Sequence, residues 1–228
     1  CMMAVLLTLE VRQDNNTKNT PWYEFKEGVK FVLHHRLFLT LILLSWISMF
    51  FGTSYVQIMP LFADMLQSGE RGFGLLISAT GIGSIIGNLF ISHYQESRKL
   101  GIMMLSSAAI APFCLIGFSL VAWIFAGKAG VFWMACCFVI LASALSSVFL
   151  VSSMTVLQVK VPDDFRGRVM GIHSITFSMI SLGGLVAGVI AAKFSAPVAV
   201  VIGALVVISS VTLVVLKFSE IIKLDLNK

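Results

Sequence analysis

Residues 158–171 read Gln-Val-Lys-Val-Pro-Asp-Asp-Phe-Arg-Gly-Arg-Val-Met-Gly, and the rest of the chain is organised around this stretch. Long runs without any Asp, Glu, Lys or Arg lie on both sides of it. Its own charged residues are Lys160, Asp163, Asp164, Arg166 and Arg168. A dense charge cluster between charge-free apolar runs is typical of a short water-facing loop that joins two membrane spans. The stretch therefore predicts a membrane protein.

The composition indicates that the solvent of this chain is a bilayer rather than water. Of its 228 residues, 58% are hydrophobic and 12% are charged, and the mean hydropathy is +0.96. Soluble domains carry about 25% charged residues. The net charge is +5, but the basic residues lie in short segments between apolar runs and not along one face. We therefore expect the lipid bilayer as a partner and no nucleic acid.

Six charge-free stretches are long enough to cross a bilayer, which takes about 20 mostly apolar residues in a helix. They cover residues 37–63, 72–95, 100–127, 129–159, 169–192 and 194–216. These stretches lack the alternation of period two that transmembrane strands show, and they are too long for such strands. The sequence predicts an all-α membrane protein, a bundle of six transmembrane helices. Pro60 is expected to kink the first of them.

The Lys and Arg residues are distributed unequally between the two sets of connecting segments. Thirteen of the 16 fall on the side that holds residues 158–171 and both chain ends, whereas Arg71, Lys128 and Lys193 fall on the other side. Cytoplasmic loops carry the excess of basic residues in membrane proteins. We therefore expect a multi-pass protein of the cell membrane, the inner membrane of a bacterium, with both ends in the cytoplasm.

The chain begins with Cys and not with Met, and its first residues are apolar, like the tail of a longer span. We interpret it as a fragment; the alternative is a trimmed form of an intact protein. The expected boundaries are the end of a truncated span at 1–9, a cytoplasmic linker and amphipathic helix at 10–36, six transmembrane helices at 37–216 and a cytoplasmic tail at 217–228.

The second half of that linker has the pattern of a surface helix. Thr20 can cap it, and Pro21 suits its first position. Apolar side chains recur at helical spacing, while basic side chains face away from them. The apolar set is Trp22, Phe25, Val29, Val32 and Leu33, and the basic set is Lys26, Lys30 and His34. The pattern predicts a basic amphipathic helix at the membrane surface. The alternative is a solvated linker with an accidental stripe.

Small residues recur four positions apart in two of the predicted spans. The two ladders are Ala79, Gly83 and Gly87 in the second span and Gly184, Gly188 and Ala192 in the fifth. Helices in lipid associate by close packing over small residues, because no hydrophobic effect drives them together. The ladders therefore predict tight helix packing, which is either static or a surface where helices slide during a cycle.

Polar side chains within the spans are the candidates for a substrate path. Tyr55 and Gln57 are costly to bury in lipid and suit the lining of a wet cavity, and Ser146 of the fourth span joins them as a candidate. A single Ser is more often bonded to its own helix backbone. His173 lies near the start of the fifth span, where it is either a packed imidazole or a proton-carrying group.

Residues 158–171 carry helix boundary signals as well as charge. Pro162 is expected to end one helix, and Asp163 or Asp164 to cap the next, because negative charge is stabilised at exposed helix amides. Arg166 and Arg168 then project from the first turn. Capping and cytoplasmic anchoring explain part of this pattern without any further role.

The sequence carries no catalytic or cofactor pattern. It contains no HExxH, GxxxxGK[ST] or GxSxG motif, and its cysteines lack the CxxC spacing of metal sites. No Asp or Glu lies in the middle of a span, although ion-coupled carriers usually need an intramembrane acid. We therefore expect no enzyme, no cofactor and no bound metal, and an intramembrane enzyme ranks last among the functions considered.

Residues 161–171, preceded by Gln158, resemble the loop between the tenth and eleventh helices of major facilitator superfamily transporters. The resemblance is closest to bacterial efflux members, the branch with macrolide and siderophore exporters. Residues 27–32 resemble the helix that leads into the C-terminal half of these proteins, and residues 60–63 resemble the end of the seventh helix. Residues 72–76, with the glycines that follow them, resemble the eighth helix.

The resemblance implies the C-terminal six-helix half of a twelve-helix secondary transporter, whose N-terminal half would be a missing partner. The substrate would be an amphipathic small molecule, exported by rocking of the two halves about a cavity lined by Tyr55, Gln57 and Ser146. A cytoplasmic gate would pair in the outward-facing state and separate in the inward-facing one; its residues would be Asp163, Asp164, Arg166 and Arg168. The alternative is an intact six-span membrane scaffold or homodimer-forming module with no transport path.

Overall fold

The computed structural model describes residues 21–94, 100–126, 128 and 130–217. In this part of the chain, six helical segments are long and apolar enough to cross a membrane, and no strand occurs, so the predicted fold class is confirmed. The segments are Arg36–Met65, α5 (Gly69–Tyr94), α6 (Leu100–Ile124), α7 (Val131–Lys160), α8 (Asp163–Lys193) and α9 (Ala196–Lys217). The predicted stub at 1–9, the linker at 10–20 and the tail beyond Lys217 lie outside the described residues.

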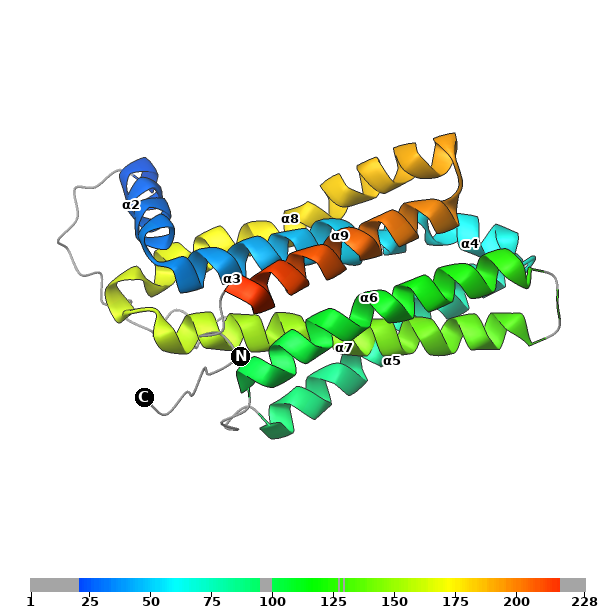
Figure 1. The fold of residues 1–228 in the computed structure, drawn as a ribbon, viewed down its shortest axis with the longest axis horizontal. Coiled ribbons are helices and arrows are strands. Elements are labelled where there is room, and N and C mark those ends of the chain that lie inside the picture. The colour runs from blue at the N-terminus through cyan, green and yellow to red at the C-terminus, as the bar shows by residue number, and fades with distance from the viewer. Residues whose placement is uncertain (1–20, 95–99, 127, 129, 218–228) are drawn as a thin grey trace, which may run out of the picture.

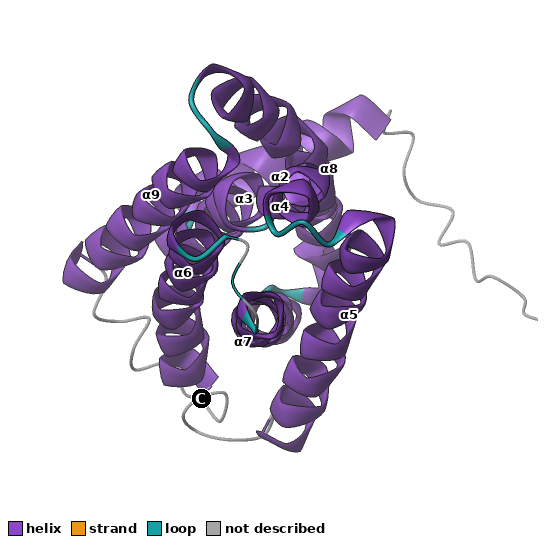
Figure 2. Ribbon diagram, turned by 90° about the vertical axis from the view of Figure 1, so that its right-hand side faces the viewer, coloured by secondary structure: helices purple, strands orange, loops and turns teal. Residues whose placement is uncertain are grey.

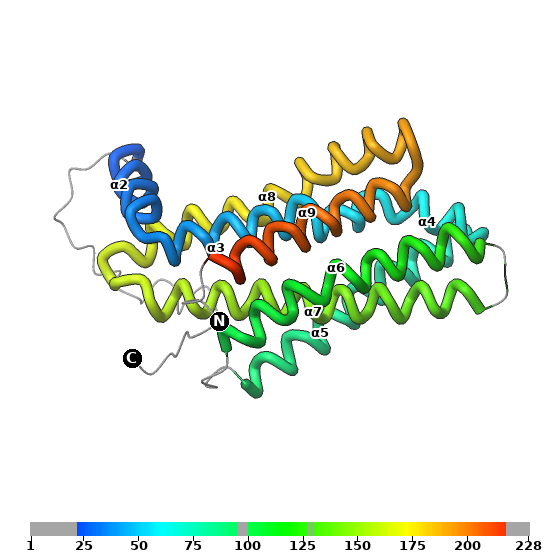
Figure 3. Tube along the Cα trace, in the orientation of Figure 1, coloured from blue at the N-terminus to red at the C-terminus, as the bar shows by residue number. Residues whose placement is uncertain are grey.

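The spans lie side by side, as seen from the side in Figure 1 and from one end in Figure 2. Helix α7 packs between α5 and α6, α6 packs against α9, and the first span packs against α8 and α9. Each span runs opposite to the one before it, as the chain path in Figure 3 shows. The α7–α8 connection therefore lies at one end of the bundle, and the α6–α7 and α8–α9 connections lie at the other.

The first span is not one continuous α-helix. It runs as α3 (Arg36–Ile47), a π-helical turn η1 (Ser48–Gly52), a 3₁₀ segment η2 (Ser54–Ile58) and α4 (Met59–Met65). The irregular stretch lies before Pro60 and not at it. Pro60 occupies the first turn of α4, where its missing N–H removes no helical hydrogen bond.

Backbone carbonyls of the π-helical turn lie against glycines of two neighbouring helices. A Cβ added to Gly183 of α8 would overlap the carbonyl oxygen of Phe50, and one added to Gly203 of α9 would lie 2.7 Å from the carbonyl oxygen of Phe51. A π-helical turn widens the helix by one residue, so its carbonyls project further than those of an α-helix. The two glycines provide the space for that bulge.

The charge-rich stretch around residue 163 is mostly helical and is not a loop. Helix α7 extends to Lys160 and α8 begins at Asp163, so two residues connect them. Pro162 is the N-cap residue, and α8 has no side-chain capping hydrogen bond. The expectation that Asp163 or Asp164 caps α8 is therefore wrong. Both carboxylates lie instead in the first turn of α8, where the positive end of the helix dipole stabilises their negative charge.

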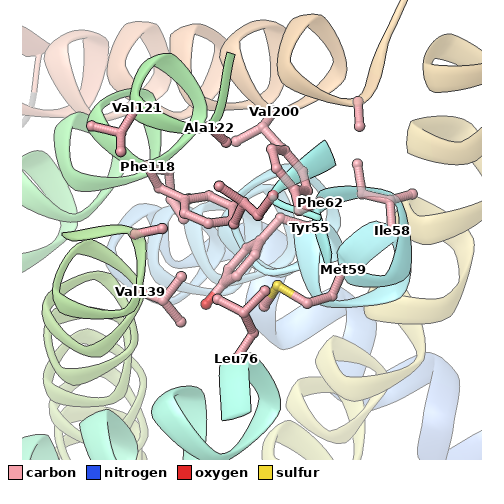
Figure 4. Packing of buried hydrophobic residues seen from close by; sticks show 14 of the residues in the cluster. Tyr55, Ile58, Met59, Phe62, Leu76, Phe118, Val121, Ala122, Val139 and Val200 are labelled. Carbon is pink, nitrogen blue, oxygen red and sulfur yellow. The ribbon is translucent and has the colours of Figure 1, made fainter. Parts of the chain in front are cut away.

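Two clusters of buried hydrophobic side chains hold the bundle together. One surrounds η2, α4 and α6, and Figure 4 shows Tyr55 in it among Phe62, Phe118 and Leu76. The other surrounds α3 and includes Leu41. Dispersion contacts and close fit stabilise such clusters in lipid, since the surrounding hydrocarbon is as apolar as the side chains.

Helix α2 (Pro21–His34) leaves the line of α3 at His35, whose φ of −108° and ψ of 100° are extended. Figure 1 shows α2 crossing the end of the bundle where α7 and α8 meet. The apolar stripe predicted for this helix is divided between two faces. Val32 is buried against the bundle, whereas Trp22, Phe25 and Leu33 are exposed.

Candidate substrate cavity and charged cluster

A hollow of about 230 Å³ opens among the first span, α5, α7 and α8. Seven of its twelve lining residues carry a hydroxyl group, and none carries a formal charge. The hydroxyl set is Thr53, Tyr55, Thr80, Ser84, Ser143, Ser146 and Ser147, and the apolar set is Met49, Val56, Leu150, Phe177 and Ile180. Such a surface can hold an uncharged or amphipathic molecule by apolar contact and a few hydrogen bonds.

Helical spacing brings these side chains to one surface. Thr80 and Ser84 lie four residues apart on α5, and Ser143 and Ser147 lie four apart on α7, so each pair shares a helix face. Thr80 Oγ1 donates to the Ile77 carbonyl at 2.6 Å, and Ser84 Oγ donates to the Thr80 carbonyl at 2.9 Å. Because the backbone satisfies these donors, their lone pairs stay available to a bound molecule.

Tyr55 and Ser143 join the first span to α7. Their hydroxyl oxygens lie 2.9 Å apart in a hydrogen bond, and Tyr55 is only 5% exposed. The ring packs in the core cluster near Phe118, with ring centroids 6.3 Å apart. Tyr55 therefore reaches the hollow with its polar end while its ring anchors η2 in the core.

A second site lies where α2 meets the start of α8. Arg168 donates a hydrogen bond to Glu27 of α2 at 2.8 Å, and its guanidinium lies 5.4 Å from the ring centroid of Phe165. Phe165 stacks on Phe31 of α2, with centroids 4.3 Å apart and planes 9° apart. A Cβ added to Gly28 would lie 2.9 Å from Arg168 Cβ, so the helices approach closely here. Three kinds of contact thus hold α2 on α8.

The sequence model of the Major Facilitator Superfamily matches residues 1–181. The chain belongs to the Major Facilitator Superfamily. Searches of curated proteins and of solved structures returned no match. Members of this superfamily are multi-pass membrane transporters that sit in lipid bilayers and bind small-molecule substrates.

In this major facilitator chain, two of the three predicted cavity residues lie at the hollow. Tyr55 and Ser146 line it, and Ser146 also lines a smaller void of about 20 Å³ beside η1. Gln57 is exposed and does not line the hollow; its Cβ and Cγ pack over Gly184 of α8. Tyr55 and Gln57 lie two residues apart in a 3₁₀ segment, so their side chains leave the span in different directions and Gln57 meets α8 instead of the hollow.

Five lining hydroxyls of this chain were not among the predicted cavity residues, namely Thr53, Thr80, Ser84, Ser143 and Ser147. The signal for most of them was their spacing of three or four residues within a span, a polar stripe on an apolar helix. Thr53 had no such signal, because it lies in the irregular stretch between η1 and η2. Its position depends on how the broken helix turns.

The two small-residue ladders differ in their surroundings. A Cβ on Gly83 would overlap the carbonyl oxygen of Ile140, and a Cβ on Gly87 would overlap that of Ala144. Ala79, one turn before them, is buried on the same face of α5. In α8 a Cβ on Gly184 would overlap Gln57, but one on Gly188 would meet nothing within 4 Å. Gly188 therefore packs against no helix in the described part of the chain, and Gly183 takes that role.

His173 is buried in α8, at 2% exposure. Its Nε2 has no hydrogen-bond partner among the described residues, and neither has Thr176 Oγ1 one turn further on. A buried polar nitrogen without a partner is costly, so a water that hydrogen-bonds it would be stabilised there. This is the one predicted proton group, and the structure places it between the charged cluster and the hollow along α8.

The predicted gate residues do not all pair with one another. Arg166 and Asp163 form an exposed ion pair of 2.7 Å within the first turn of α8. Arg168 instead pairs with Glu27, a residue that was not among the predicted gate residues, and Asp164 is exposed. No group of three or more His, Cys, Asp or Glu side chains could hold a metal ion in the part of the chain that the structure describes.

Proposed function

We propose that this chain is the C-terminal half of a secondary active transporter that exports amphipathic small molecules by alternating access. The hollow of seven hydroxyl-bearing and five apolar side chains supports this substrate class. A charged substrate would need a compensating charge in a low-dielectric site, and the lining supplies none. A molecule with apolar surface and a few hydrogen-bonding groups suits the lining best.

The direction of transport follows from the resemblance of residues 161–171 to bacterial exporters. In this proposal the N-terminal half of the same protein closes the open side of the hollow, and both ends of the chain lie in the cytoplasm. The charged residues at the start of α8 then form part of the cytoplasmic gate, and His173 is the proton group. Arg168 and Glu27 are the gate pair that spans two elements.

The test is efflux of a neutral amphipathic dye from cells that express this chain together with its proposed N-terminal half, with and without an uncoupler of the proton gradient. A Ser146→Phe variant should fill the hollow and lower efflux at least tenfold. The bulky ring would occupy space that the substrate needs, and overpacking of this kind costs about 1–3 kcal/mol. Ser209→Phe is the matched control, since Ser209 is exposed on α9 and donates to its own helix.

Two results would contradict the proposal. Efflux equal to that of cells without the protein would favour the alternative, a six-span membrane scaffold or homodimer-forming module. Equal efflux by the Ser146→Phe and Ser209→Phe variants would show that the hollow is not the substrate path.

A further inference from the structure

Helix α2 has an orientation that differs from every spanning helix. It has 14 residues and crosses one end of the bundle, whereas the spans run along the length of the bundle (Figure 1). The extended backbone of His35 makes this turn. Because the spans cross the bilayer, a helix laid across their ends runs close to parallel with the membrane surface.

The outward face of α2 is apolar and has no partner among the described residues. Trp22 is 66% exposed, Leu33 is 60% exposed, and Phe25 lies on the same side. At about 100° of turn per residue, Trp22 and Leu33 fall within about 20° of each other around the helix. The opposite face is the one occupied by Gly28 and Phe31, which pack on α8.

Basic side chains border this apolar face. Lys26 and Lys30 follow it on one side and are exposed, and the Lys26 ammonium lies 5.8 Å from the Trp22 ring centroid. A hollow of about 290 Å³ adjoins Lys30, with His34 and His35 in its wall. The carboxylate in that wall, Glu27, is already engaged by Arg168, so the hollow keeps a basic character.

We propose that α2 is a binding surface for anionic phospholipids of the leaflet on which it lies. Trp22, Phe25 and Leu33 enter the interface between headgroups and acyl chains, and Lys26 and Lys30 pair with lipid phosphates. Trp suits this depth because its ring is apolar and its N–H is polar. Lys suits it because the long stem follows apolar surface while the ammonium stays at the phosphates.

The proposal does not depend on transport, and it links lipid to the charged cluster through one helix. The face of α2 opposite to the lipid surface carries Glu27 and Phe31, which hold Arg168 and Phe165. Anionic lipid bound to α2 would therefore hold the start of α8 in its present position.

The experiment reads the depth of Trp22 in vesicles by fluorescence. The full chain carries Trp46, Trp123 and Trp133→Phe, which leaves Trp22 as its one indole. It is reconstituted in phosphatidylcholine or in phosphatidylcholine mixed with phosphatidylglycerol, with bromine on the acyl chains of one lipid at a time. We expect brominated lipid to quench Trp22, and brominated phosphatidylglycerol to quench more than its share of the mixture.

The variant that tests phosphate recognition is Lys26→Gln with Lys30→Gln. Each lysine near an anionic surface contributes about fivefold in affinity, so the preference for phosphatidylglycerol should fall by roughly 30-fold. The preference is a ratio, so any direct effect of Lys26 on Trp22 emission cancels. Lys128→Gln with Lys193→Gln, at the opposite end of the bundle, is the charge-matched control and should keep the preference.

Each remaining outcome overturns the proposal. The absence of quenching in both lipids would show that α2 lies off the bilayer or is covered by protein. Quenching without a preference for phosphatidylglycerol, or a preference that survives loss of both lysines, would show that phosphate recognition by Lys26 and Lys30 is wrong.

Discussion

Arg168 of α8 donates a hydrogen bond from Nη1 to Oε2 of Glu27, 141 residues earlier in the chain, at 2.8 Å. The bond joins the surface helix α2 to the first turns of a spanning helix. Its neighbours are a stacked pair, Phe31 and Phe165, and a glycine, Gly28, that lets the two backbones approach. The charged cluster is thus a contact between two elements and more than a set of loop charges.

This contact predicts that Arg168 and Arg166 differ in importance. Arg168→Gln should lower dye efflux several-fold while leaving membrane insertion intact, because α8 loses its bond to α2. Arg166→Gln should change efflux little, since its partner Asp163 lies in the same turn and both are exposed. Efflux and the amount of inserted protein are the two measurements.

The pair itself is tested by reversal of charge. Glu27→Arg with Arg168→Glu should recover most of the efflux that either single change removes. Partly exposed ion pairs contribute about 0.2–1 kcal/mol, so the coupling free energy from a double-mutant cycle should fall in that range. A coupling of zero would show that the two side chains act independently.

The bond between Tyr55 and Ser143 predicts a loss of stability. Tyr55→Phe keeps the ring in the core cluster and removes the hydroxyl, which should cost about 0.5–1.5 kcal/mol of folding free energy. Thermal unfolding in detergent measures this loss. Tyr94→Phe is the control, because Tyr94 is exposed at the end of α5. If Tyr55→Phe with Ser143→Ala costs no more than either change alone, the hydrogen bond is the interaction lost.

The close contact of α5 with α7 predicts that a larger side chain at Gly83 lowers the stability of the protein. Gly83→Val should force the helices apart and cost about 1–3 kcal/mol, because its branched side chain would meet the Ile140 carbonyl. Unfolding temperature and the yield of inserted protein report the effect. Gly81→Val is the control, since a Cβ there meets nothing within 4 Å.

A substitution at Gly188 should raise the stability of the protein, whereas the substitution at Gly83 lowers it. Gly188→Ala should stabilise the chain by about 0.5–1 kcal/mol, because alanine loses less backbone entropy in a helix than glycine and has free space here. The same unfolding measurement applies. If Gly188→Ala instead lowers the stability of the full-length protein, Gly188 packs against a segment outside the described residues.

The burial of His173 predicts a specific loss if it carries protons. His173→Gln should abolish accumulation driven by a proton gradient while substrate exchange at equal concentrations on both sides continues. His93→Gln at the exposed end of α5 is the control. A variant that loses both activities, or neither, would assign His173 to packing.

The number and kind of helices could be read from the residue order. A charged side chain or an unbonded peptide group is costly in hydrocarbon, so six long charge-free stretches have to form six helices. Lys160 and Pro162 mark the end of α7 in the same way, but charge does not mark the start of α8, whose first two turns carry four charged residues. Local chemistry therefore decides the number and the approximate positions of the spans.

The faces and partners of those helices depended on the tertiary structure. Tyr55 lines the hollow and Gln57 packs over Gly184, and the rotation of the span that decides this is set just before them, where the π-helical turn fits against Gly183 and Gly203. A regular α-helix would have placed both residues differently. The helix rotation that follows from this fit is a property of three packed elements, and no single stretch of sequence carries it.

The charged stretch at residues 158–171 has one feature that the sequence alone decides and one that the tertiary structure decides. Its composition alone placed a membrane boundary there, since charge must leave the hydrocarbon. Its partner was decided by tertiary contact, because α2 turns at His35 and brings Glu27 to Arg168 across 141 residues. The sequence contains several acidic side chains that could pair with Arg168. The crossing of α2 and α8 decides which of them lies within hydrogen-bonding distance.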